Sequence, residues 1–165
     1  MAAVHPNRNA GYFSLSGSVG ETLREAPMKF RRSRWKPGTV YGIPLADGSF
    51  GIGQSIDAMW ESVIYIAVFS YHFDRLPVAP PHLEAEDILS LGAVLRPDLN
   101  NGSWATIGIA EPIVGKQDFP NEAFSTSGYV GAEFSSGGVF SEFLSACFGL
   151  TPGTPWLMKI AGRPT

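Results

Sequence analysis

The side chains that could carry out chemistry are few, and several lie near the middle of the chain. His72 and Asp74 stand two residues apart, which is the spacing of two neighbours on one face of a strand. His82 follows ten residues after His72. Because no third ligand has a matching spacing, this pair does not define a metal site. We expect instead a half-buried His72 that is hydrogen-bonded to a neighbour.

Three acids could supply paired carboxylates for general acid–base chemistry: Glu84, Glu86 and Asp87. A short helix over Glu84–Leu91 explains them more simply, because carboxylates are stabilised at the positive end of a helix dipole. We therefore expect a solvated first helical turn here and assign these acids no catalytic role.

Cys147 is the single cysteine of the chain, so an internal disulfide is excluded. It shares an apolar stripe with Phe140, Phe143 and Leu144, at the spacing expected of a helix over Phe140–Phe148. Its neighbours in sequence supply no cation that would favour the thiolate. We therefore expect Cys147 to be a packing residue.

Motifs for nucleotide binding and nucleophilic catalysis are missing from the sequence. Gly51-Ile52-Gly53 lacks the third glycine of a dinucleotide fingerprint and precedes an expected strand rather than a helix. There is no P-loop and no Gly-x-Ser-x-Gly nucleophile elbow. The sequence therefore predicts no catalytic residue, no cofactor, no metal site and no small-molecule ligand.

The bulk composition predicts one globular domain. The 165 residues are 44% hydrophobic and 16% charged, which excludes wholesale disorder, and 19 Gly and 13 Pro predict many turns. No stretch approaches the roughly 20 apolar residues of a membrane span, and the N-terminus lacks an apolar signal core, so we expect a cytoplasmic protein. Residues 1–27 predict a flexible extension, followed by a single β-rich domain over residues 28–165.

The net charge of −3 is unevenly distributed along the chain. Residues 28–36 carry five basic residues and no acid, whereas residues 37–165 carry 5 basic and 13 acidic residues. An acidic body discourages nucleic-acid binding and would steer a basic partner. The basic stretch has only Phe30 and Trp35 to stack on bases, so we expect a solvated arm or one folded over the body.

The stretch Gly38–Gln54 predicts a β-hairpin with Asp47-Gly48 at its turn. Pro44 has no N–H for a ladder, which favours a four-residue loop over Ala46–Ser49 and an unpaired outward edge at Pro44. With a loop of that length, Ile43 would pair with Ile52 across the hairpin. The bulky side chains would then share one face, namely Tyr41, Ile43, Leu45, Phe50 and Ile52. The opposite face would consist of Gly42, Pro44, Gly51 and Gly53. We expect this glycine face to be covered by another part of the chain or to receive a partner.

The remaining elements predict a mainly β (α+β) fold. Val63–Phe69 is an unbroken β-branched and aromatic run, typical of a central strand buried on both faces. Further strands are expected over Gly92–Leu95, Trp104–Ala110, Tyr129–Phe134 and Trp156–Ile160, and a turn over Asp98–Gly102. Phe119 and Phe124 should anchor an irregular segment on the core. We expect a bent antiparallel sheet or a small barrel with about two short flanking helices.

Several of these residues also match a known pattern, namely Lys36-Pro37-Gly38, Val40-Tyr41, Ile43-Pro44-Leu45, Asp47-Gly48, Phe50-Gly51 and Gly53. Together with the apolar strand that follows, they resemble the immunity-26 family of bacterial polymorphic-toxin systems, which is also labelled as a small phosphotriesterase. Trp104, Ile107 and Gly108 are similar to a later Trp-x-x-Ile-Gly strand of that family, and Phe119-Pro120 to a further element. The resemblance covers roughly residues 36–120.

The resemblance implies a cytoplasmic antidote that binds a cognate toxin domain and blocks its active site or its substrate path. Such a protein needs no catalytic residues of its own. The acidic body suits a basic toxin such as a nuclease. The partner-binding residues that we expect combine the glycine face with acids of the body: Gly42, Pro44, Gly51, Gly53, Asp57, Glu61, Asp74, Glu84, Glu86 and Asp87.

Two other functions compete with this interpretation. The family label suggests a small hydrolase of phosphotriesters, for which His72, Asp74 and the acids over Glu84–Asp87 would be the candidate groups. The basic arm suggests nucleic-acid binding, which the acidic body makes the weaker hypothesis.

Overall fold

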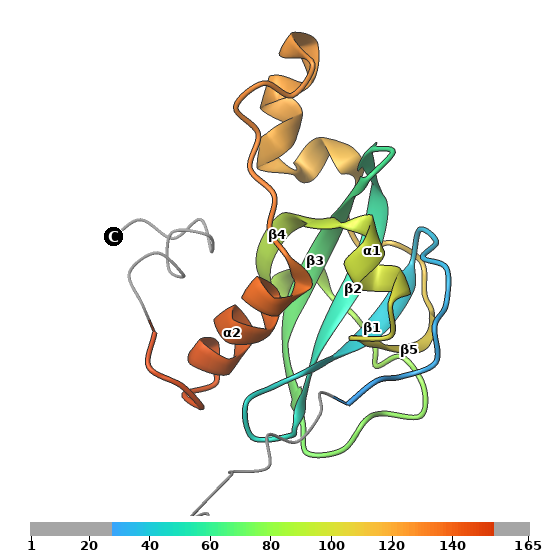
Figure 1. The fold of residues 1–165 in the computed structure, drawn as a ribbon, viewed down its shortest axis with the longest axis vertical. Coiled ribbons are helices and arrows are strands. Elements are labelled where there is room, and N and C mark those ends of the chain that lie inside the picture. The colour runs from blue at the N-terminus through green and yellow to red at the C-terminus, as the bar shows by residue number, and fades with distance from the viewer. Residues whose placement is uncertain (1–27, 154–165) are drawn as a thin grey trace, which may run out of the picture.

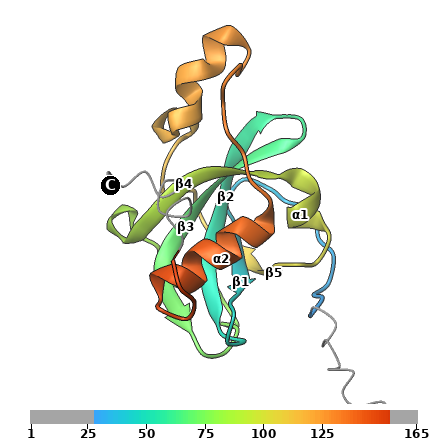
Figure 2. The same cartoon turned by 60° about the vertical axis from the view of Figure 1, so that its left-hand side comes forward.

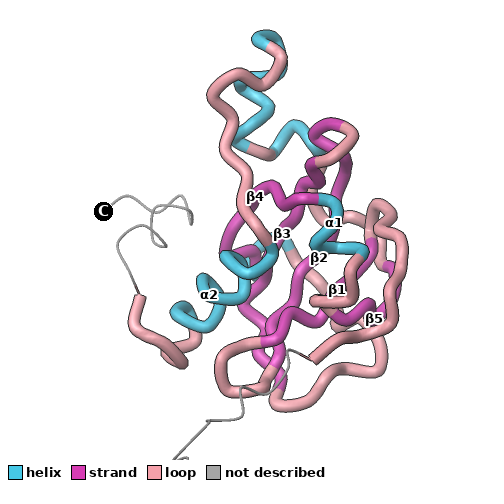
Figure 3. Tube along the Cα trace, in the orientation of Figure 1, coloured by secondary structure: helices cyan, strands magenta, loops and turns pink. Residues whose placement is uncertain are grey.

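The computed structural model describes residues 28–153 and shows an open antiparallel sheet of five strands in the order β4-β3-β2-β1-β5 (Figures 1 and 3). The strands are β1 (Thr39–Pro44), β2 (Phe50–Trp60), β3 (Val63–Phe73), β4 (Ile88–Leu95) and β5 (Ala105–Ile109). The short helices are η1 (Ala85–Asp87), α1 (Arg96–Asn100), η2 (Lys116–Asp118), η3 (Pro120–Ser127) and α2 (Gly137–Cys147). The predicted mainly β (α+β) class is confirmed, and the sheet is open rather than closed into a barrel.

Strand β3 is the central strand that the apolar run predicts. Its side chains alternate between two cores, because successive residues of a strand point to opposite faces. Ile64, Ile66 and Val68 belong to one core, while Val63, Tyr65, Ala67 and Phe69 belong to the other. All seven side chains are buried, so β3 is covered on both faces as predicted.

Helix α2 covers one face of the sheet (Figure 2). Phe140, Phe143 and Leu144 are buried against the sheet, which confirms the first part of the predicted apolar stripe. Cys147 is exposed, so the prediction that it is a packing residue is wrong. The helix ends at Cys147, and the next residue, Phe148, packs at the end of the sheet instead.

The opposite face is covered by loops and short 3₁₀ helices rather than by an α-helix. Leu83 and Phe119 are buried there, and Phe119 stacks on Tyr65 with ring centroids 4.3 Å apart. Phe119 is thus the predicted anchor, whereas Phe124 is partly exposed and does not act as one. Gln54 fixes this covering segment, because its buried amide bonds to three backbone groups, namely the carbonyls of Ala110 and Glu111 and the N–H of Ile113.

The β1–β2 hairpin forms where it is predicted, but its register differs by one residue. The Leu45 N–H bonds to the Ser49 carbonyl, so three residues separate them instead of the expected four. Gly48 has a φ of +84°, as the third loop residue of such a hairpin requires. Ile43 therefore faces Gly51 rather than Ile52, and the pairing of β1 with β5 ends before Pro44.

This shift distributes the bulky side chains over both faces of the hairpin. Tyr41 faces Gly53 and Ile43 faces Gly51 on the α2 side, while Gly42 faces Ile52 on the other. The prediction of one bulky face and one bare face is therefore wrong. Each glycine instead lies beside a large neighbour, and both faces of the hairpin can be packed.

Strand β4 replaces the predicted helix over Glu84–Leu91. Only Ala85–Asp87 form a short 3₁₀ turn, and Ile88–Leu95 pair with β3, with one register shift between Ser90 and Ile88. The acids of this region do favour a helix start locally, but pairing with the buried strand β3 overrides that preference. The expected turn over Asp98–Gly102 is also mostly helical, because Arg96–Asn100 form α1.

The segment Tyr129–Phe134 is not the strand that its composition predicts. Gly128, Tyr129 and Gly131 all have positive φ values, which a continuous strand does not accommodate. A single parallel bridge joins Ser135 to Val94 of β4. Segment η3 and the loop after it form a lobe that projects beyond the sheet, next to the β2–β3 turn (Figure 1).

The basic arm lies against the body, which was one of its two expected states. The Phe30 N–H bonds to the Gly102 carbonyl, and the Trp35 N–H bonds to the Asn100 side chain. The expected strand over Trp156–Ile160 and the expected extension over residues 1–27 lie outside the described residues.

Candidate protein-binding surface

His72 and Asp74, the pair with spacing for chemistry, lie at and just beyond the end of β3. His72 is exposed rather than half-buried, but it is hydrogen-bonded as expected, with its Nε2 2.7 Å from the Ser49 hydroxyl. Its ring also stacks on Phe148, with centroids 4.8 Å apart. Across residues 28–153, no three His, Cys, Asp or Glu side chains gather closely enough to hold a metal ion.

The hairpin loop and the end of β3 bring together the three residue types of a nucleophilic triad, namely Asp47, Ser49 and His72. Their hydrogen bonds, however, run in a different order from those of a triad. In a triad, the histidine accepts the serine proton and the carboxylate holds the histidine. Here the Asp47 carboxylate accepts both the hydroxyl and the backbone N–H of Ser49, and these bonds lower the pKa of Asp47. The Ser49 oxygen then accepts from the Nε2–H of His72, which is the reverse of nucleophile activation. The arrangement secures the hairpin loop.

The predicted glycine face is covered within the chain. Gly42, Gly51 and Gly53 are all buried. A Cβ atom at Gly51 would lie 2.8 Å from the Leu144 Cδ1, and one at Gly53 would lie 2.9 Å from the Ile43 Cδ1. These glycines therefore admit neighbouring side chains, which is the first of the two interpretations of the bare face.

The other predicted partner-binding residues reach the surface in separate places. Pro44 is half-buried and borders a groove of about 490 Å³ between the hairpin loop and residues 28–29. Asp57 is exposed near the end of β2, and Glu61 is exposed at the β2–β3 turn. The acids of the opposite end of the β3–β4 pair are Asp74, Glu84, Glu86 and Asp87. The structure thus splits the predicted acids into two groups and does not bring them together.

The acids at the end of the β3–β4 pair that lies opposite the β2–β3 turn have local partners. Glu84 lies 3.2 Å from His82. Asp87 accepts a hydrogen bond of 2.7 Å from the Tyr71 hydroxyl, and this bond raises the pKa of Tyr71 to about 12. Their contacts are those of a surface turn.

An exposed aromatic surface lies at the other end of the sheet, and we call its three residues, Trp60, Tyr129 and Phe134, the tip surface. Trp60 ends β2 and is 40% exposed, while Phe134 is 46% exposed. The Trp60 ring meets Tyr129 at 5.5 Å and Phe134 at 6.4 Å between centroids, both edge to face. Large side chains held in fixed positions at the surface are typical of a protein-binding site.

A buried network holds the tip surface in place. Glu122 accepts hydrogen bonds from the hydroxyls of Tyr129, at 2.8 Å, and Tyr65, at 2.7 Å. Lys116 completes the network, with its Nζ 3.9 Å from Glu122 and 2.9 Å from the Ala58 carbonyl. Burial alone would raise the pKa of Glu122, but the two tyrosine hydroxyls and Lys116 outweigh it and lower that pKa. The projecting lobe is therefore tied to β2 and β3.

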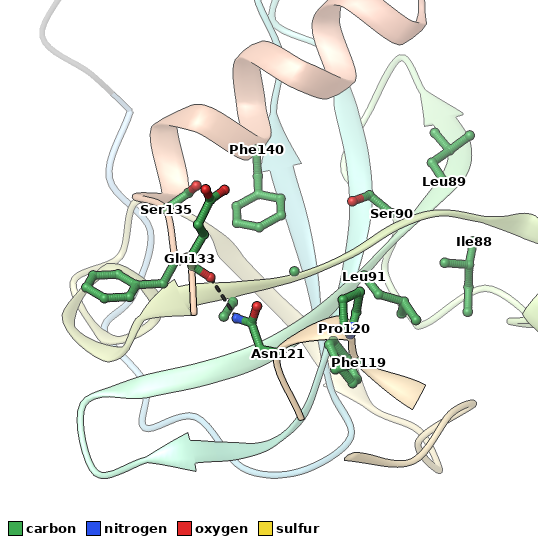
Figure 4. A pocket seen from close by; sticks show the side chains of 13 residues that line it. Ile88, Leu89, Ser90, Leu91, Phe119, Pro120, Asn121, Glu133, Ser135 and Phe140 are labelled. Carbon is green, nitrogen blue, oxygen red and sulfur yellow. Dashed lines mark hydrogen bonds between the residues drawn. The ribbon is translucent and has the colours of Figure 1, made fainter. Parts of the chain in front are cut away.

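A groove of about 440 Å³ follows the outer edge of β4 and ends beside the tip surface. Its floor is the strand from Ile88 to Ala93, and Phe134 belongs to both features. Figure 4 shows Phe140 on one side of the strand and Phe119 and Pro120 on the other. We call this feature the β4 groove.

Sequence reasoning missed both the tip surface and the β4 groove. Trp60 stands in a polar break between Asp57 and Ser62, and a tryptophan in a predicted surface turn is a signal that could have marked it. The contacts of Trp60 with Tyr129 and Phe134 join residues about 70 positions apart, so no local pattern predicts them.

The fold and its surface define a mainly β protein with an open sheet, an aromatic tip and a groove along one edge strand. Comparisons with protein-family models, with curated proteins and with solved structures gave no match for the chain. In the stretch from residue 28 to residue 153, every helix is too short or too polar to span a membrane.

Proposed function

We propose that the protein binds and neutralises a cognate bacterial toxin domain in the cytoplasm, by covering the active site or the substrate path of the toxin. The observation that carries this proposal is the tip surface. Trp and Tyr are enriched among the residues that dominate protein–protein binding, and truncating such a residue costs about 2 kcal/mol or more of binding free energy. The resemblance of the β1–β2 hairpin to immunity-26 proteins gives the class of partner.

The charges around the tip surface favour a basic partner. Asp57, Glu61 and Glu133 are exposed acids near the three aromatic side chains. Of the nearby cations, Lys116 is paired with Glu122, and the exposed Arg96 donates to the Glu61 carbonyl, 3.1 Å away. An acidic rim around an aromatic centre would accelerate association with a cationic surface such as that of a nuclease domain.

The hydrolase alternative receives less support from the geometry of the described residues. Its candidate His72 donates to Ser49 and stacks on Phe148, and its other candidate acids lie in surface turns. We therefore put forward no catalytic function.

The test is co-expression with the C-terminal domain of the toxin encoded by the neighbouring gene. The wild-type protein should restore growth of the host and elute with the toxin domain in size-exclusion chromatography. Phe134→Ser and Trp60→Ala should each weaken the complex at least about 30-fold, which corresponds to about 2 kcal/mol.

Ile109→Ser is the matched control, because Ile109 is also an exposed hydrophobic residue, at 63%, but lies on β5 at the far edge of the sheet. It should leave toxin binding and growth unchanged. Continued killing by the toxin and the absence of a complex with the wild-type protein would contradict the proposed function. A complex that tolerates both tip variants would contradict the assignment of the surface.

A further inference from the structure

The basic arm over residues 28–36 is fastened to the body near both of its ends. Near its start, the Phe30 N–H bonds to the Gly102 carbonyl at 2.7 Å. Near its end, the Trp35 N–H bonds to the Asn100 side chain at 2.9 Å. Figure 1 shows the arm in blue, on the side of the sheet that carries β1 and β5. The arm therefore has a fixed position beside β5.

The side chains of the arm divide between the body and the solvent. Phe30, Ser33 and Trp35 are half-buried. The Phe30 ring meets Phe50 edge to face, at 6.1 Å between centroids, and the Ser33 hydroxyl oxygen lies 2.6 Å from that of Thr106 on β5. The basic side chains of the arm are all exposed, namely Lys29, Arg31, Arg32, Arg34 and Lys36. Packing of the uncharged residues thus presents the charges to solvent.

The five basic side chains have no anionic partner in the described part of the chain. None of them forms an ion pair or a side-chain hydrogen bond there. Acids do lie in segments beside the arm, but Asp47 bonds to Ser49, and Asp98 accepts a hydrogen bond of 2.8 Å from the Gly137 N–H. Like charges held so close together repel one another, and an anionic partner would remove that cost.

The densest group of acids lies at the far edge of the sheet from the arm. Glu84, Glu86 and Asp87 directly precede β4, and the arm contacts β5, which is the opposite edge strand. Four strand spacings of about 4.8 Å separate the two edges by about 19 Å along the sheet, which exceeds the ~8 Å over which physiological salt screens exposed charges. The net charge of the chain therefore does not describe the charge that a partner meets at the arm.

The arm offers a partner charge and very little apolar surface. Phe30 and Trp35 face the body, which leaves only Met28, at 62% exposed, as a large apolar side chain in solvent. Protein partners take affinity from aromatic and apolar anchors in a core depleted of charge, and membranes from apolar side chains that enter the bilayer. The phosphate backbone of nucleic acid instead gives affinity through charge alone, by release of counterions. It is the polyanion that suits the arm best.

The inward packing of the two aromatic rings favours a duplex over a single strand. Single strands gain affinity when their bases stack on aromatic side chains. The Phe30 ring lies against Phe50, and Trp35 packs on the core beneath α2, so neither ring is presented to a base. A duplex needs no such stacking and carries one charge per ~1.7 Å of its axis. Contacts to phosphates alone carry no direct sequence information.

We propose that the basic arm binds the phosphate backbone of duplex nucleic acid without sequence preference. Its guanidinium and ammonium groups would donate charge-assisted hydrogen bonds to phosphate oxygens. The inference goes beyond the proposed function, because the arm shares no residue with the tip surface and its binding requires no toxin.

The test is titration of residues 1–165 into a short fluorescein-labelled DNA duplex, followed by fluorescence anisotropy at a series of salt concentrations. If all five basic side chains contact phosphates, the logarithm of the binding constant should fall against that of the salt concentration with a slope of about −4.5. The affinity should then drop about 500-fold between about 50 and 200 mM salt. Duplexes of unrelated sequence should bind equally, and a single strand of the same length should bind more weakly.

A pair of double variants shows whether the arm is responsible. Arg31→Ala with Arg34→Ala should reduce the size of the slope by about two, because each substitution removes one phosphate contact. Arg31→Lys with Arg34→Lys is the matched control, which keeps both charges and should keep the slope of wild type. Thermal unfolding should be the same for both double variants, because neither side chain has a hydrogen bond or an ion pair within the described residues.

Three results would overturn the inference. The first is the absence of duplex binding at the lowest salt concentration. The second is an alanine double variant with the slope of wild type, or a lysine double variant that loses as much of the slope as the alanine one. The third is tighter binding to vesicles of anionic lipid or to a polyglutamate peptide than to the duplex, which would assign the arm to a membrane or to an acidic protein. None of these results depends on the toxin, so the proposed function stands or falls separately.

Discussion

The β1–β2 and β2–β3 hairpins share strand β2 but place their large side chains in opposite ways. In the β1–β2 hairpin, Tyr41 and Ile43 face glycines and are fully buried beneath α2. At the β2–β3 turn, Trp60 is 40% exposed and lies against the aromatic rings of a projecting lobe. The large side chains of the first hairpin are therefore buried in the core, whereas those at the turn of the second are exposed to solvent.

The residues of the sequence motif and the exposed aromatic residues lie in different hairpins. The β1–β2 hairpin carries the residues from which we inferred a resemblance to immunity-26 proteins, yet its glycines are buried within the chain. The β2–β3 turn carries no such motif, yet it has the exposed aromatic residues. The motif therefore specifies a way of packing the sheet, and the exposed tip surface is built from contacts between distant segments. Four substitution experiments test this division.

The largest effect is expected at Gln54. Its side chain lies on β2 and holds the segment over residues 110–113 by hydrogen bonds. Gln54→Leu removes one amide that satisfies two carbonyls and one N–H, so we expect a loss of roughly 3 kcal/mol in the free energy of unfolding. Urea denaturation measures it. The exposed Gln117 provides the control, because Gln117→Leu should change stability by less than about 0.5 kcal/mol. Equal stability of the two variants would show that the segment is not held by Gln54.

The next effect concerns the buried glycines. Gly51→Val places a branched side chain against Leu144, and overpacking of this kind should cost about 2 kcal/mol of stability. Gly138→Val is the control, because a Cβ there meets only the Ser136 hydroxyl oxygen, at 3.7 Å. If Gly51→Val folds with wild-type stability but no longer binds the toxin, the glycine face is an interface and the comparison fails.

Two tyrosine hydroxyls should give changes of opposite sign. In the described chain, the buried Tyr41 hydroxyl makes no hydrogen bond, and burial raises its pKa to about 12. Tyr41→Phe should therefore stabilise the protein by about 1 kcal/mol, whereas Tyr65→Phe loses the bond to Glu122 and should destabilise it by about 1 kcal/mol. Thermal unfolding of both variants would distinguish them, and a loss in both would show that the Tyr41 hydroxyl is satisfied.

The smallest effect is a pH dependence of the lobe. The lowered pKa of Glu122 means that folding favours its carboxylate, so this stabilisation is present above the ordinary pKa of a glutamate. It is lost as the pH falls through the lowered, folded-state pKa. Glu122→Gln should therefore be less stable than wild type at pH 7, and the difference should shrink at acid pH. Glu142→Gln, at an exposed position on α2, should show no such change with pH. If the stability difference between Glu122→Gln and wild type stays constant with pH, the role of Glu122 in the network is contradicted.

Sequence patterns predicted what depends on strong local periodicity. The buried β3 run, the β5 segment and the apolar stripe of α2 all formed, because their side chains match one regular element. The predicted register of the β1–β2 hairpin was wrong, because the loop is one residue shorter than predicted. A shift of one residue moves every side chain to the other face. The acids before Ile88 predicted a helix, but pairing with β3 decided the structure.

The candidate site could be predicted only in part. Asp57 and Glu61 were expected to contact a partner, which stays a prediction; both are exposed, and Glu61 directly follows Trp60. Trp60, Tyr129 and Phe134 were missed, because each is unremarkable in its own segment and the surface arises from their meeting. Tyr129 has a positive φ, and composition gave no sign of it.

The most direct measurement is amide hydrogen exchange of the protein alone and in complex with the toxin domain that we propose as its partner. Binding through the tip surface should slow exchange in residues 57–62 and 128–135 and leave the hairpin loop over residues 45–49 unchanged. Slower exchange in the hairpin loop with none at residues 57–62 would contradict the account and return the binding surface to the β1–β2 hairpin.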